Sequence, residues 1–319
     1  MIRAERLRKT HRSPSRSARG APVVAVEELS FEVGPGEIVG LLGPNGAGKT
    51  STMHMLATLA RPTSGRARVA GHDLATRPRA VRRAIGYVAQ RGAASSESRV
   101  GDELVDYGML HGLTPVEARA RARQLADRYR LSHLWAREAG TLSGGQRRRL
   151  DIAMSLVHAP RLVLLDEPTA GLDPASRAAL WGHVRELRET TGMTVLLSTH
   201  YLDEADALCD RVLVMSRGRL LADGPPTRIK RQIGPDTLVV TAASESELPG
   251  LVAVLQAATG SAPQVSGPEV SVRFPGGTSG LADLLAGLRE MGLRPESIEL
   301  RPPTLDEAFL ALTAEGATT

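Results

Sequence analysis

Hydrophobic residues in this chain fall into short runs separated by longer stretches where they recur at helical spacing. Residues 37–42 form a compact apolar run that contains glycine, which is typical of a strand buried in a parallel sheet. After Thr50 the apolar positions follow the spacing of a helix that Arg61-Pro62 ends. This alternation of short strands and helices predicts an α/β fold with a mostly parallel sheet.

The same alternation continues to about residue 215. Thr114 and Glu117 predict a capping box at the start of one helix, with Pro115 at its first position. A helical insertion is therefore expected at about 91–140. The expected elements are short strands around turns at 65–90, helices at 101–130, after Gly145 and from Pro174, and strands at 161–166, 193–198 and 211–215.

The pattern changes after Gly224-Pro225-Pro226. The rest of the chain predicts a β-α-β-β-α-β-α order, which suits a small two-layer α+β domain with its helices on one face of the sheet. We therefore expect a larger domain over 21–230 and an accessory domain over 231–319. The expected elements of the second are strands at 237–242, 263–266, 270–274 and 295–300 and helices at 247–258, 279–291 and 304–313.

Composition limits the classes of protein that fit. Cys209 is the single cysteine and lies in an apolar stretch, so we expect a packed thiol and neither disulfides nor a cysteine zinc site, as in a reducing compartment. No run approaches the about 18 consecutive apolar residues of a membrane-spanning helix, so the chain is expected to be soluble.

The net charge of +5 comes from the N-terminus. Residues 1–20 carry seven basic side chains and one acid, which leaves the rest of the chain at −1. Because this stretch also holds several serines, we predict a disordered basic tail over 1–20. A solvated tail is the simpler interpretation, and contact with anionic lipid or a partner is the alternative. The nearly neutral remainder does not favour nucleic-acid binding.

A phosphate-binding loop is the first candidate site. Its residues fit the pattern G-x-x-x-x-G-K-S/T between a predicted strand and a predicted helix. Glycines let backbone N–H groups face a phosphate, and the helix N-terminus adds partial positive charge. Lys49 can reach the β- and γ-phosphates, and the Thr50 hydroxyl can ligate Mg²⁺. The loop comprises Gly43, Pro44, Asn45, Gly46, Ala47, Gly48, Lys49, Thr50 and the following Ser51.

Two acids follow the apolar run at 162–165. Asp166 is expected at the carboxyl edge of the sheet, where open α/β sheets bind ligands, and can hold Mg²⁺. Glu167 can polarise an attacking water. A strand followed by a solvated acidic turn is the alternative for this run taken alone.

A second helix N-terminus suited to phosphate is predicted at Ser143. Ser143 is a natural N-cap, and Gly144 and Gly145 leave their amides uncovered. A flexible linker is the alternative, which the helical spacing of apolar residues after Gln146 disfavours.

These three segments, in this order, resemble the ATP-binding-cassette family over residues 21–230. Three further positions match motifs of that family. Gln90 resembles the Q-loop glutamine, which contacts Mg²⁺ and faces a membrane partner. Asp173 lies in a segment similar to the D-loop, and His200 resembles the switch histidine at the γ-phosphate. Segments 143–151, 199–206 and 303–309 also resemble the daunorubicin-resistance type of exporter ATPase.

The resemblance implies a P-loop NTPase-type ATP-binding domain with a helical subdomain, and hydrolysis of ATP with Mg²⁺. It assigns catalysis to Glu167, His200 and Lys49, and the metal to Thr50, Gln90 and Asp166. Two subunits would meet head to tail, because the site of each is completed in trans by Ser143, Gly144, Gly145, Gln146 and Asp173 of the other.

The resemblance also implies the partners. A permease on a separate chain would bind and carry a drug or other hydrophobic substrate, and would contact Gln90 and the insertion at 91–140. The ATPase would then lie peripherally on the cytoplasmic face of the membrane, with no nucleic acid bound.

Two alternatives stay open at this point: a non-transport cassette ATPase acting on nucleic acid or ribosomes, and an importer ATPase. The first class usually carries two cassettes in one chain, a zinc module or a long coiled-coil insertion, and the sequence shows none of these. The C-terminal segment favours export over import.

The adenine contact departs from the family. Members usually stack adenine on an aromatic side chain ahead of the phosphate loop, but this sequence has no Phe, Tyr or Trp before Phe31, which is expected inside a strand. The resemblance places Arg19-Gly20-Ala21 at that position. We predict that Arg19 stacks on adenine as a planar cation, or that adenine is held weakly.

Overall fold

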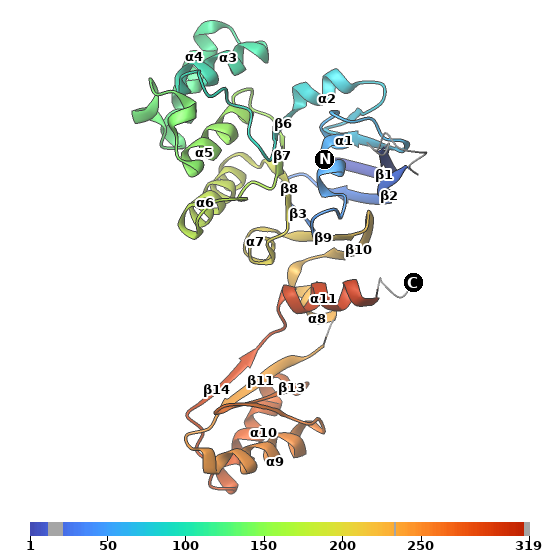
Figure 1. Cartoon of the computed structure of the whole chain (residues 1–319), viewed down its shortest axis with the longest axis vertical. Helices are drawn as coiled ribbons and strands as arrows, with labels where there is room; N and C mark the ends of the chain where they lie inside the picture. The colour runs from blue at the N-terminus through green and yellow to red at the C-terminus, as the bar shows by residue number, and fades with distance from the viewer. Residues whose placement is uncertain (12–21, 233, 316–319) are drawn as a thin grey trace, which may run out of the picture. The chain divides into compact units, whose positions relative to one another are not determined.

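The computed structural model describes residues 1–11, 22–232 and 234–315. The chain separates into two compact units, Met1–Pro226 and Thr227–Thr319 (Figure 1). The sequence predicts this boundary four residues later, between 230 and 231.

The first unit is built on a six-stranded sheet with the order β10-β9-β3-β8-β7-β6. All neighbouring strands in it are parallel except β10, which pairs antiparallel with β9 at the edge. Every residue of β3, β7 and β8 is buried, which explains their continuous apolar runs and confirms the predicted parallel α/β core. The strands are β3 (Ile38–Leu42), β6 (Ile85–Val88), β7 (Leu162–Asp166), β8 (Thr194–Thr199), β9 (Arg211–Ser216) and β10 (Arg219–Gly224).

The first unit contains a second sheet, and it shows that the predicted disordered tail is wrong for residues 2–11. Residues 2–11 form β1, which pairs antiparallel with β2 and β4. Ile2, Ala4 and Leu7 are buried, because apolar residues alternate with the charged ones that dominate the composition here. The remaining predicted tail residues, 12–20, lie outside the described ranges. The sheet has the order β2-β1-β4-β5 and comprises β1 (Ile2–His11), β2 (Val23–Val33), β4 (Ser64–Val69) and β5 (His72–Asp73).

The helices of the first unit follow the predicted pattern with one correction. Residues 78–84 form a helix with Pro78 at its start, where the sequence predicts strands and turns. The predicted capping box of Thr114 and Glu117 is present, and α3 and α4 lie side by side in the helical insertion (Figure 1). The helices are α1 (Lys49–Leu56), α2 (Pro78–Ala84), α3 (Val100–Leu110), α4 (Pro115–Arg128), α5 (Gly144–Ser155), α6 (Pro174–Thr191) and α7 (Leu202–Leu208), with 3₁₀ turns at Ser132–Leu134 and Ala139–Thr141.

The second unit contains a four-stranded antiparallel sheet with the order β12-β13-β11-β14. Leu238 and Val240 of β11 share one core with Leu251 of α9 and Leu288 of α10, so both helices cover the same face of the sheet, as predicted. The elements are α8 (Pro226–Gln232), β11 (Asp236–Thr241), a 3₁₀ turn at Glu245–Glu247, α9 (Leu248–Thr259), β12 (Gln264–Ser266), β13 (Glu269–Phe274), α10 (Gly277–Glu290), β14 (Ser297–Arg301) and α11 (Leu305–Glu315).

Cys209 packs against β3 of the central sheet. Its thiol is buried, and a Cβ added to Gly40 of β3 would lie 2.7 Å from the Cys209 Sγ, so a larger residue at Gly40 would force the sulfur to shift. Burial raises the pKa of this thiol. In the described ranges, no helix has the length and apolar character needed to span a membrane.

Candidate functional site

The phosphate loop connects β3 to α1, and close backbone approaches fix its glycines. A Cβ added to Gly43 would lie 2.3 Å from the carbonyl oxygen of Met215. Gly48 has a φ of +99°, and a Cβ there would lie 2.3 Å from the carbonyl oxygen of Ala25. These positions accept only glycine. The loop therefore brings its backbone N–H groups to the N-terminus of α1, as the sequence predicts.

Lys49 is folded back over this loop. Its side chain is 4% exposed, and Nζ donates to the carbonyl oxygens of Gly43 (2.7 Å) and Pro44 (3.0 Å). Nζ also lies 3.6 Å from Oε1 of Glu167. Burial lowers the pKa of Lys49, and the charge of Glu167 opposes that shift. The ammonium group is thus buried against the loop with a carboxylate as its counter-ion.

Asp166 ends β7 beside the first turn of α1. Its Oδ1 accepts hydrogen bonds from the Ser198 hydroxyl (2.6 Å) and the Thr50 hydroxyl (3.3 Å). Its Oδ2 is buried and has no hydrogen-bond partner among the residues that the structure describes. A buried carboxylate oxygen without a donor, next to a threonine hydroxyl, is a donor set that suits Mg²⁺. The residues present therefore fit the metal that the sequence predicts here.

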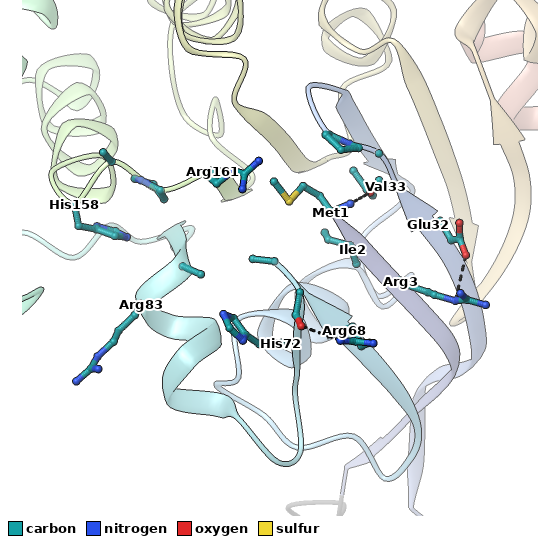
Figure 2. Close-up of a pocket in the computed structure, with 17 residues that line it drawn as sticks. Met1, Ile2, Arg3, Glu32, Val33, Arg68, His72, Arg83, His158 and Arg161 are labelled. Carbon is teal, nitrogen blue, oxygen red and sulfur yellow. Dashed lines mark hydrogen bonds and ion pairs between the residues drawn. The ribbon is translucent and has the colours of Figure 1, made fainter.

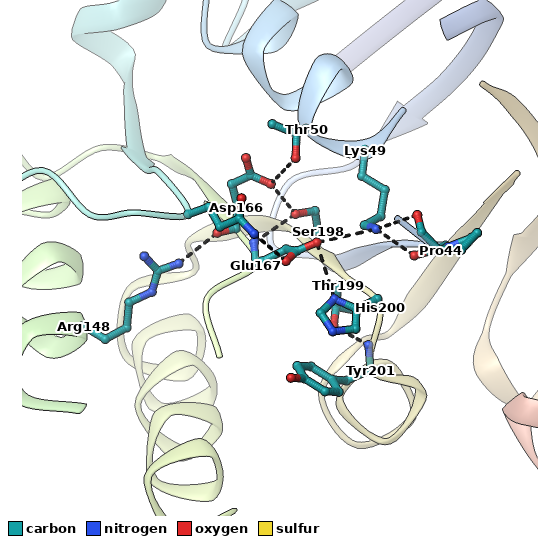
Figure 3. Close-up of polar contacts among 12 residues, drawn as sticks. Pro44, Lys49, Thr50, Arg148, Asp166, Glu167, Ser198, Thr199, His200 and Tyr201 are labelled. Atoms are coloured by element: carbon teal, nitrogen blue, oxygen red, sulfur yellow. Dashed lines mark hydrogen bonds and ion pairs between the residues drawn. The ribbon is translucent and has the colours of Figure 1, made fainter. Parts of the chain in front are cut away.

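Glu167 is the centre of the polar cluster in Figure 3. Its carboxylate accepts a hydrogen bond from Nε2 of Gln90 (2.9 Å) and lies 3.5 Å from Nδ1 of His200, in addition to the Lys49 contact. Its backbone has a φ of +44°, which is uncommon for a residue with a Cβ. Two bonds to Ser198 hold that conformation: the Glu167 N–H donates to the Ser198 hydroxyl (3.0 Å) and to its carbonyl oxygen (3.2 Å).

The structure thus brings the predicted catalytic residues together, and it places Gln90 on Glu167. Sequence reasoning did not identify Ser198, which orients both acids. The available signal was the polar carboxyl end of β8, where Ser198 and Thr199 follow three apolar residues.

A second group of predicted residues gathers where α5 and α6 begin. Ser143 and Gln146 form a capping box at the start of α5. Asp173 caps α6, where its Oδ1 accepts from the N–H of Ser176 (2.9 Å). A Cβ added to Gly145 would lie 3.1 Å from the Ser176 hydroxyl, so the two helix starts are neighbours. Among the described residues, no hydrogen bond joins this group to the phosphate loop.

His11 is a second residue that sequence reasoning missed. It ends β1, and its Nε2 lies 3.3 Å from the hydroxyl of Ser51 in the first turn of α1. An aromatic ring therefore lies beside the phosphate loop. The predicted adenine contact, Arg19, falls outside the described ranges.

A separate cavity of about 850 Å³ lies at the amino-terminal ends of strands in the central sheet, away from the phosphate loop (Figure 2). Ala84 and Arg161, which precede β6 and β7, contribute to its wall, whereas the phosphate loop follows the end of β3. Among the other lining residues, Arg3 is paired with Glu32 at 3.3 Å. This cavity is distinct from the phosphate site.

Comparison with known proteins agrees with this geometry. The model of the family described as ABC transporter matches residues 26–170. The chain is 42% identical to the daunorubicin resistance ATP-binding protein DrrA2 of Streptomyces coeruleorubidus, over 91% of this chain and 90% of the relative. It is 36% identical to the Nod factor export ATP-binding protein I of Burkholderia thailandensis, over 91% of this chain and 92% of the relative.

The solved structure of cbiO1 from Clostridium perfringens, described as part of the ABC transporter complex cbiONQ, superposes with a TM-score of 0.63 at 28% identity, over 73% of this chain and 92% of that one. The P-loop NTPase fold and ATP binding are thereby confirmed, and the relatives favour export over the importer and nucleic-acid alternatives. The chain belongs to the ABC transporter family and is the ATP-hydrolysing subunit of an ABC exporter.

Proposed function

We propose that this subunit hydrolyses ATP with Glu167 as the group that activates water. The observation that carries the proposal is the placement of this buried carboxylate between Gln90, His200 and Lys49. A carboxylate in that setting can accept a proton from a water aimed at the γ-phosphate. Backbone N–H groups of residues 45–51 bind the phosphates, and Lys49 neutralises the negative charge on them.

Thr50 and Asp166 would hold Mg²⁺ together with the amide oxygen of Gln90, whose amide nitrogen bonds Glu167. When bound, the ion neutralises charge that develops on the phosphates. His200 would contact the γ-phosphate and hold it opposite the water.

The site is completed by a second copy of the chain. The start of α5 at Ser143–Gln146, where Ser143 and Gly144 are exposed, and the exposed Asp173 of one subunit would face the ATP held by the phosphate loop of the other. Uncovered helix amides favour an anion, so ATP joins the two subunits, and repulsion between ADP and phosphate after hydrolysis weakens that link. This homodimer would drive a permease on a separate chain, at the cytoplasmic face of the membrane.

The exported substrate would be a drug or another hydrophobic compound. The similarity to the daunorubicin resistance protein supports this class of substrate. The adenine of ATP would stack on His11, because its ring lies beside Ser51 at the start of α1.

The test uses Lys49→Ala. Loss of one electrostatic contact to the transferring phosphate should lower Mg²⁺-dependent ATP hydrolysis by at least about 10²-fold. Lys230→Ala, a lysine substitution in the other unit, is the control. In cells that also produce the permease, daunorubicin export should stop with Lys49→Ala. Near-normal hydrolysis by the purified Lys49→Ala protein would refute the assignment of the ATP site, and unchanged export would refute the coupling to transport.

A further inference from the structure

Arg148 of α5 lies behind the catalytic acids, with its side chain only 7% exposed. Its guanidinium group donates three hydrogen bonds to backbone carbonyl oxygens: Nε to Pro168 (2.8 Å), Nη1 to Ala89 (2.7 Å) and Nη2 to Asp166 (2.9 Å). Figure 3 shows the side chain pointing toward the end of β7. A charged donor makes such bonds stronger than neutral ones.

The three carbonyls belong to the two segments that carry the site. Asp166 and Pro168 are the residues on either side of Glu167, and Ala89 immediately precedes Gln90. One planar group therefore fixes the backbone around the catalytic carboxylate and around the glutamine bonded to it. Arginine suits this task because its donors form a rigid fork, which a lysine ammonium group lacks.

Other side chains of α5 hold the far side of the Gln90 loop. Oδ1 of Asp151 accepts hydrogen bonds from the N–H groups of Ala93 (2.9 Å) and Ala94 (3.3 Å). Arg147 donates from Nη2 to the carbonyl oxygen of Ala94 (2.7 Å). Side chains of helix α5 thus form hydrogen bonds with the loop on both sides of Gln90. A displacement of the helix would therefore move the loop with it.

We propose that Arg148 is a positioning residue for hydrolysis, which sets Glu167 and Gln90 in place relative to α5. This inference rests on the proposed role of Glu167. It implies that Arg148 acts on the chemical step and not on nucleotide affinity, because its bonds go to the backbone behind the acids and not to the phosphate loop.

The test compares Arg148→Lys with Arg149→Lys in the full-length protein. Arg149 is the next residue of α5 and is half-buried, so it controls for loss of an arginine from the helix. A displacement of about 1 Å at a reacting group can cost on the order of 10²-fold in rate. We expect Arg148→Lys to lower kcat by about 10- to 100-fold with the Kd for ATP within about threefold, and Arg149→Lys to change neither.

A double-mutant cycle with Glu167→Gln distinguishes a role of Arg148 in positioning Glu167 from a general contribution to the stability of the protein. If Arg148 acts through Glu167, Arg148→Lys lowers the rate of wild type but not the residual rate of Glu167→Gln. Unchanged kcat, weakened ATP binding with kcat retained, or additive losses would each overturn the proposal. Should Arg148→Lys lose its cooperative thermal transition, Arg148→Gln is measured by the same criteria. A wild-type rate in Glu167→Gln alone would instead refute the proposed function itself.

Discussion

Replacing Glu167 by glutamine changes one oxygen to an amide nitrogen in the middle of the polar cluster. The carboxylate contacts Gln90 at 2.9 Å, His200 at 3.5 Å and Lys49 at 3.6 Å. Glutamine keeps the shape and can still accept the Gln90 hydrogen bond. The substitution therefore removes the charge and the basicity of this side chain while leaving the phosphate loop and Asp166 in place.

The loss of rate follows from the role assigned to the carboxylate. Removal of a general base typically costs about 10²- to 10⁴-fold, so we expect hydrolysis to fall by about 10³-fold, or about 4 kcal/mol of activation free energy. Without nucleotide, Lys49 loses its buried counter-ion but keeps two carbonyl acceptors. We therefore expect the free energy of unfolding to fall by less than about 3 kcal/mol.

The assay has a kinetic and a structural readout. Phosphate release is measured for wild type, for Glu167→Gln and for Glu186→Gln, in which the change is made in an exposed glutamate paired with Arg128. The Glu167→Gln protein is then passed through a size-exclusion column with ATP or with ADP. Because it binds ATP but hydrolyses it very slowly, it should elute as a dimer in ATP and as a monomer in ADP, whereas Glu186→Gln should behave as wild type.

Two results would refute this reasoning. Hydrolysis by Glu167→Gln within a few-fold of wild type would show that another group activates the water. A monomer in ATP, from a protein that binds the nucleotide normally, would show that ATP does not join two subunits.

Three further predictions concern other parts of the chain. In a fluorescent-ATP titration, His11→Ala should weaken ATP binding by about 1 kcal/mol because base stacking is lost. His11→Tyr should restore the affinity, and Arg19→Ala should leave it unchanged. An effect of Arg19→Ala alone would assign the adenine contact to Arg19. Burial, with the nearby His111, lowers the pKa of His158 from 6.5 to about 4, so the unfolded state takes up a proton first and stability should fall as the pH drops from about 6.5 to about 4. Urea unfolding at pH 7 and pH 5 should show a smaller loss for His158→Gln than for wild type, and equal losses would disprove this linkage. A protein ending at Pro226 should retain ATP binding and measurable hydrolysis, because the groups assigned to chemistry all lie between Gly43 and His200; a well-folded truncation that binds no ATP would contradict that division of labour.

The parts of the site that local spacing alone could predict are those whose residues are adjacent in the chain, whereas Gln90 and His200 rested on the family resemblance. The phosphate loop and Asp166-Glu167 each combine a buried strand with the residues that follow it, so local spacing determines their placement. By contrast, Arg148 contacts carbonyls 18 to 59 residues away. The sequence shows three consecutive arginines at 147–149 and contains no local sign of which one turns inward.

Strand β1 could not be predicted from the sequence for a different reason. Arg6 has a φ of +46°, and the pairing with β2 shifts register between Ala4 and Leu7, which breaks the apolar alternation halfway along the strand. Charge then dominates the local composition and resembles that of a disordered tail. The same charged composition conceals His11, because a residue of a disordered tail has no fixed place beside the phosphate loop.

The burial of Cys209 has a practical use. Thiol reagents react with the thiolate form of cysteine. The Cys209 thiol is buried against the sheet and its pKa is raised, so we expect it to react slowly. Because the chain has no other cysteine, a new one at exposed Leu110 would take up a maleimide dye selectively without removal of the native residue. Energy transfer between two such dyes, one on each subunit, would then test whether two ATPase subunits pair and separate during turnover.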